Sequence, residues 1–136
     1  MIDEDKQPGI RFHDIILVKE FFERSPDFPD KTKINIEFEF SSNDEDKDYY
    51  AELVTRLNCY SEEEEKVLTI ECTHIAFFGV IEGQENMEIG TYIKNNAAAL
   101  MFPFIREHIH SLSKKAGINP IALPPINIKA MLKNKE

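Results

Sequence analysis

The sequence predicts an α+β fold: a four-stranded antiparallel sheet meander, a long kinked helix, an extended apolar loop and a short C-terminal helix. Four segments with strand-like patterns follow one another with only short turns between them. From about Glu85 onward, helical spacing and proline-rich sequence replace those patterns. Strands and helices do not alternate, which excludes parallel βαβ folds. The 136 residues are expected to form a single domain, 1–136, in which residues 1–9 are disordered.

The predicted strands cover residues 10–23, 33–42, 49–60 and 66–81. The second is the clearest, because apolar and polar side chains alternate along it. Its apolar face consists of Ile34, Ile36, Phe38 and Phe40. The first strand contains four consecutive apolar residues, 15–18, so both of its faces need covering. That pattern indicates burial by something beyond a single chain.

Apolar residues at helical spacing predict a long helix after the fourth strand. Its apolar face is Ala97, Leu100, Met101, Phe104, Ile105, His108, Ile109 and Leu112. Pro103 removes one helical hydrogen bond and predicts a kink, and Gly117 suits the residue that follows the helix. An apolar, proline-rich loop over 118–128 follows. Asn127 can cap a last helix that carries Ile128, Met131 and Leu132.

The composition limits the class of function. A formal charge of −9 disfavours non-specific binding to nucleic acid. No apolar run is long enough to span or insert into a membrane, and the polar N-terminus does not resemble a signal peptide, so a cytoplasmic protein is expected. Cys59 and Cys72 fall out of register in a hairpin of their two strands, which predicts two buried free thiols.

No catalytic motif is visible, so an enzyme is not expected. The four histidines lack the spacing of metal ligands and are interpreted as structural or surface residues. The acidic turns at 44–48 and 62–65 lack the calcium-loop pattern, and no cofactor or metal is expected. Apolar surface in excess of what 136 residues can bury predicts an oligomer interface, a binding groove or both. A module that binds a small molecule or lipid, and an adaptor for one folded partner, remain alternatives.

The run FPFIREHIHSLSKKAGINPIALPPINIKAML, residues 102–132, resembles the C-terminal region of the bacterial protein-export chaperone SecB. The preceding GVIEG and long helix fit that family, and the resemblance extends over residues 12–132. It implies a homotetramer, a dimer of dimers paired through the helices. It also implies an ATP-independent holdase that keeps unfolded polypeptides and preproteins competent for translocation by the motor ATPase SecA.

Carried over by position, the resemblance implies a client groove lined by Ile34, Ile36, Phe38, Phe104, Ile121, Leu123 and Leu132. Phe104 is alternatively assigned to the helix interface. Glu20 matches one acidic position of the family's docking patch for SecA on the outer sheet face. Two further positions, Arg24 and Thr69, are not acidic here, and the family's long acidic tail does not match. The second interpretation is therefore a dedicated SecB-like chaperone of an antitoxin in a toxin–antitoxin system.

Overall fold

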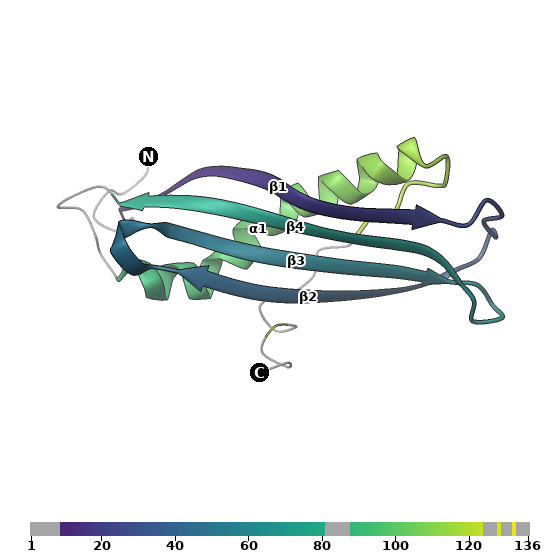
Figure 1. Cartoon of the computed structure of the whole chain (residues 1–136), viewed down its shortest axis with the longest axis horizontal. Coiled ribbons are helices and arrows are strands. Elements are labelled where there is room, and N and C mark those ends of the chain that lie inside the picture. Colours follow the sequence, from purple (N-terminus) through teal and green to yellow (C-terminus); the bar gives the residue numbers. More distant parts are fainter. Residues whose placement is uncertain (1–8, 81–87, 124–127, 129–131, 133–136) are drawn as a thin grey trace, which may run out of the picture.

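A computed structural model describes residues 9–80, 88–123, 128 and 132 (Figure 1). Its elements, in chain order, are β1 (Ile10–Arg24), β2 (Lys33–Asn43), the 3-10 turn η2 (Glu45–Lys47), β3 (Tyr49–Tyr60), β4 (Lys66–Val80) and α1 (Ile89–Lys115). Every predicted strand is present, with each end within about one residue of its expected position. The α+β prediction is therefore confirmed. The expected disorder of residues 1–9 falls on a segment of which only Gly9 is described.

The four strands form one antiparallel sheet in the order β1-β4-β3-β2. The predicted meander is correct for β2, β3 and β4 but wrong for β1, which pairs with β4 instead of β2. Two features favour this pairing. β1 and β4 are both 15 residues long and pair from Ile10–Val80 to Arg24–Leu68, with two register shifts between these ends. The connection 25–32 carries two prolines and crosses from one edge of the sheet to the other, unlike a tight hairpin turn.

One face of the sheet is covered by α1, which crosses behind it diagonally (Figure 1). Every second residue of β3 from Ala51 to Cys59 is buried, on the face that the helix covers. The main buried side chains of α1 are spaced four residues apart: Ile93, Ala97, Met101, Ile105 and Ile109. This packing makes the helix-covered face the core of the protein.

The helix is rotated relative to the predicted apolar face. Phe102 is 6% exposed and packs in the core, whereas Leu100 and Phe104 are 38% and 48% exposed. The helix therefore carries apolar residues on two sides, and only one side faces its own sheet. α1 continues through Pro103 as a single element, and a kink at that residue stays a prediction.

The C-terminal helix is described at two positions, Ile128 and Leu132, and both are helical. Ile128 is buried, and Leu132 is partly buried against the core. The expected cap Asn127 and the neighbours Ile126 and Met131 lie outside the described residues. In the described part of the chain, no helix is long and apolar enough to cross a membrane.

Candidate functional site

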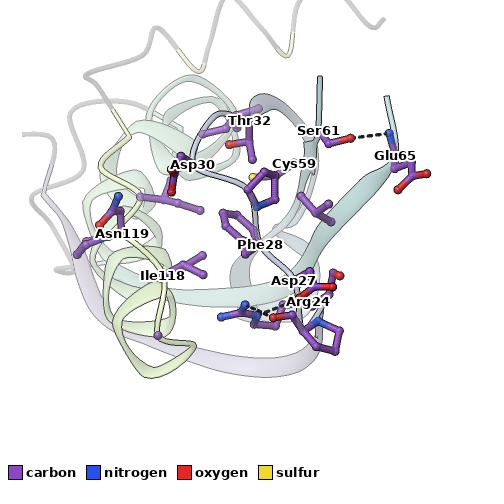
Figure 2. A pocket seen from close by; sticks show the side chains of 18 of the residues that line it. Arg24, Asp27, Phe28, Asp30, Thr32, Cys59, Ser61, Glu65, Ile118 and Asn119 are labelled. Carbon is purple, nitrogen blue, oxygen red and sulfur yellow. Dashed lines mark hydrogen bonds between the residues drawn. The ribbon is translucent and has the colours of Figure 1, made fainter. Parts of the chain in front are cut away.

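A groove of about 1210 Å³ opens at the end of the sheet where β1 stops (Figure 2). Its walls come from three parts of the chain. The first is the crossover segment 24–32 with the start of β2 that follows it, the second is the neighbouring ends of β3 and β4, and the third is the post-helix loop 117–123. The ends of the sheet and of the helix therefore meet at one place.

The post-helix loop turns back toward the sheet because of how α1 ends. The Ile118 amide donates to the carbonyl of Ser113 at 3.3 Å, and the Gly117 amide donates to that of Lys114 at 3.1 Å. This pair of bonds is the Schellman motif, which requires a left-handed residue. Gly117 meets that requirement with φ of +72°, as its position in the sequence predicted. Ile118, Ile121 and Leu123 consequently lie along the groove.

Four of the seven residues that the resemblance assigns to the client groove line this space: Ile34, Ile36, Ile121 and Leu123. Exposure decreases along β2, from 50% at Ile34 to a partly buried Ile36 and 1% at Phe38. Ile34 and Ile36 are therefore the β2 side chains that a ligand can reach.

The other three assigned residues lie elsewhere. Phe38 is buried and packs edge-to-face on Phe102, with ring centroids 6.1 Å apart. Phe104 stacks on Phe12 at 5.8 Å, which places it beside β1 on the exposed side of the helix. Leu132 packs against the core and is not among the groove-lining residues. Alternation along β2 could not separate Phe38 from Ile34, because both lie on the same face of the strand.

The crossover segment supplies groove residues that sequence reasoning treated only as a loop. Phe28 points into the groove beside Cys59 (Figure 2). The Arg24 guanidinium lies 5.5 Å from the centre of the Phe28 ring. The sequence does contain a signal for this residue, because Phe28 lies between Pro26 and Pro29. The two prolines restrict the backbone of the loop, and a restricted loop can hold an aromatic side chain in one position.

The groove has an apolar floor and an acidic rim. Burial raises the pKa of Cys59, and a hydrogen bond with Thr32 opposes that shift. The thiol is therefore neutral and adds to the floor. The lining carboxylates are Asp27, Asp30, Glu63 and Glu65, and Arg24 is the only lining cation among the described residues. No group of three or more described His, Cys, Asp or Glu side chains can hold a metal ion.

Glu20 lies on the helix-covered face. Its ladder partner, Cys72, is buried, and its Oε1 lies 2.5 Å from Nε2 of His108 on α1. The His108 ring packs edge-to-face on His74, with centroids 5.6 Å apart. Burial raises the pKa of Cys72 to about 12. The contact between Glu20 and His108 therefore links β1 to α1, and the contact between His108 and His74 extends it to a buried residue of β4.

The three positions compared with the family's docking patch do not share a face. Arg24 pairs with the buried Leu68 and thus lies, like Glu20, on the helix side. Thr69 follows Leu68 on β4, so its side chain points to the opposite face, where it bonds Asn58. These residues do not form one outer-face surface within this chain.

A second apolar surface lies at the β1 edge. It consists of Ile16, Leu17, Val18 and Phe21 on β1 and of Leu100 and Phe104 on α1. Each of these residues is between 38% and 53% exposed. Ile16 and Phe21 pair with Ile75 and Glu71 and lie on the sheet face opposite α1, so the set extends around the β1 edge onto both faces of the sheet. We call this set the β1–α1 surface. It agrees with the expectation that the first strand needs covering by something outside its own chain.

Comparison with known proteins agrees with this architecture. The family model described as SecB, preprotein translocase subunit SecB, matches residues 16–136. The chain is 29% identical over 107 residues to the protein-export protein SecB of Alcanivorax borkumensis, covering 74% of this chain and 66% of that protein. It is 31% identical over 68 residues to the protein-export protein SecB of Saccharophagus degradans, covering 50% and 40%.

An uncharacterized protein of Methanocaldococcus jannaschii is 37% identical over 60 residues, a match that covers 44% of this chain and 38% of that protein. The chain thus spans less than two thirds of the length of these relatives. Among solved structures, the fold is similar to a SecB-like chaperone of Mycobacterium tuberculosis in complex with a peptide from an antitoxin. The TM-score is 0.73 at 17% identity, with 88% of this chain and 91% of that chain covered.

Proposed function

The chain belongs to the SecB family, and from this premise we propose that it is an ATP-independent chaperone that holds unfolded polypeptides in the groove between the crossover segment, β2 and the post-helix loop. The observation that carries the proposal is the apolar lining of that groove. Ile34 is 50% exposed and Ile36 is partly buried, whereas Ile121 and Leu123, at 9% and 7% exposed, form the buried part of the lining. The proposed place of action is the cytoplasm, where a protein awaiting export is still unfolded.

The size of the groove favours a polypeptide over a small molecule. Its volume of about 1210 Å³ exceeds the roughly 300–1,000 Å³ of ordinary small-ligand pockets. Burial of one apolar client side chain contributes about 1.5–3 kcal/mol. Ordering a flexible chain offsets much of that gain. Tight binding therefore needs several grooves on one assembly, each engaging another part of the same client.

The proposed assembly is a homotetramer, a dimer of dimers, formed through the β1–α1 surface. The exposure of Val18 and Phe104, at 47% and 48%, supports this part of the proposal. β1 is an edge strand, and a long apolar edge left uncovered invites pairing with another chain. In this arrangement the groove stays open, because none of these side chains lines it.

The proposed purpose is delivery of preproteins to SecA, as the names of the two export relatives suggest. The second candidate is protection of an antitoxin, and one observation favours it: Glu20, Arg24 and Thr69 do not form an acidic patch on the outer face. Surface plasmon resonance with SecA at low salt separates the two. Absence of any SecA affinity would remove the export purpose and leave the holdase intact.

The holdase itself is tested by light scattering without ATP. A chemically unfolded reporter is diluted into buffer with the wild type or with Ile34→Asp or Ile36→Asp, because these two lining side chains are exposed or partly buried. We expect the wild type to suppress aggregation at near-stoichiometric amounts and both variants to lose that activity while keeping the oligomer. Asn35→Asp is the matched control, since it adds the same charge one residue away on the opposite face of β2. Equal suppression by the wild type and both groove variants would reject the groove assignment.

A further inference from the structure

The side chain of Arg24 joins the two walls of the groove that are farthest apart in sequence. Its Nη1 donates to the carbonyl of Ala116, the residue that caps the C-terminal end of α1, at 2.5 Å. Its Nε donates to the Ser25 carbonyl at 2.8 Å, and its Nη2 donates to the Pro26 carbonyl at 3.2 Å. All three guanidinium nitrogens are therefore occupied, and one side chain bridges positions 92 residues apart.

Each of these contacts suits an arginine in particular. The end of α1 carries the negative pole of the helix dipole, and the Ala116 carbonyl is left over when the Schellman motif has used those of Ser113 and Lys114. Charge-assisted hydrogen bonds of this kind are stronger than neutral ones. The planar guanidinium also lies over Phe28, the aromatic residue that points into the groove. A lysine has neither the fork of donors nor the flat face.

We infer that Arg24 is the positioning residue of the client groove, which holds the crossover segment against the end of α1 and so fixes the separation of the groove walls. This inference rests on the proposed function. When the groove is already held in its binding conformation, the entropic cost of ordering its loops is not subtracted from the free energy of client binding. Without the bridge, core packing still holds Ile121 and Leu123, but the crossover segment is no longer fixed to the end of α1, and the binding-competent arrangement becomes a minority state.

The test uses reduced, carboxymethylated α-lactalbumin, which is permanently unfolded, as the client. Its affinity is measured by fluorescence anisotropy for the full-length wild type, Arg24→Gln and Arg24→Lys. If the competent fraction falls to about a tenth, the apparent affinity of Arg24→Gln falls roughly tenfold. Arg24→Lys keeps the charge without the fork and is expected to be intermediate. Arg56→Gln is the matched control, because Arg56 contacts Glu39 and Glu71 on the outer face, away from the groove.

Hydrogen exchange distinguishes a local role from general destabilisation. The Ser25 amide, bonded to Val67, and the Ile118 amide should exchange faster in Arg24→Gln, whereas amides in the middle of β3 should not. Wild-type affinity in Arg24→Gln would overturn the inference. Wild-type affinity in Arg24→Lys would overturn it as well. The lysine variant therefore provides the test if the glutamine variant does not fold. A wild type that fails to bind the client would contradict the proposed function instead, and the exchange result would still report on the bridge.

Discussion

Protonation of His74 should weaken the folded state in mildly acidic solution. His74 is 5% exposed, and burial lowers its pKa from 6.5 to about 4. The charge of His108 on α1 adds to this effect, whereas Glu20 on β1 opposes it. Nδ1 of His74 has no hydrogen-bond partner within the described residues, so nothing there compensates a buried positive charge.

The sign follows from the proton count. Between pH 6.5 and about 4 the unfolded chain holds a proton on His74 that the folded chain lacks, so the free energy of unfolding falls as pH falls through this window. One pKa unit corresponds to ~1.4 kcal/mol. The free energy of unfolding therefore falls by about 3 kcal/mol once the pH is well below both the unfolded pKa of 6.5 and the folded pKa of about 4. Between ~pH 7.5 and ~pH 5.5, where most carboxylates stay ionised, the loss is about 1.3 kcal/mol.

Urea unfolding at a fixed protein concentration measures this effect at the two pH values, and the fixed concentration keeps any contribution from assembly constant. The His74→Leu variant should lack this part of the pH dependence, so its stability should fall less than that of the wild type by about 1.3 kcal/mol. His110→Gln changes an exposed histidine on α1 and should behave as the wild type. An identical pH dependence in His74→Leu and wild type would refute the reasoning.

Three further substitutions separate the core, the interface and the helix end. Phe38→Ala removes a buried ring that packs on Phe102 and should cost about 3–5 kcal/mol in urea unfolding; a cost near zero would contradict its place in the core. Phe104→Asp should lower the oligomer mass in light scattering, with groove binding per chain retained, whereas an unchanged mass would remove Phe104 from the interface. Gly117→Ala should lower stability by about 1 kcal/mol, because its φ of +72° disfavours a side chain; equal thermal midpoints would contradict the cap.

The strands could be predicted from sequence because alternation is a local signal. Ile34, Ile36 and Phe38 share a face whatever lies next to them, and the structure confirms that face. Strand order is not local. The neighbour of β1 depends on the pairing of residues 10–24 with residues 68–80, and no pattern within either strand specifies that partner.

The helix and the groove show the same limit. Spacing identifies the apolar residues of α1 but cannot tell Phe102, which faces its own sheet, from Phe104, which faces outward. The wall formed by the post-helix loop could be anticipated from the apolar residues around Ile121 and Leu123. Arg24 and Phe28 could not, because their roles depend on where the end of α1 comes to lie.

The groove is built from segments that are far apart in the sequence, which determines the stage of biosynthesis at which it can form. Its walls combine residues 24–36 with residues 117–123, and β1 finds its ladder only when β4 has been made. Contacts between such distant segments carry a large entropic cost of loop closure and lower the folding rate. A ribosome-bound chain that ends before residue 117 lacks one wall, so under the proposed function a nascent copy gains its binding groove only when almost all of its described sequence has been synthesised.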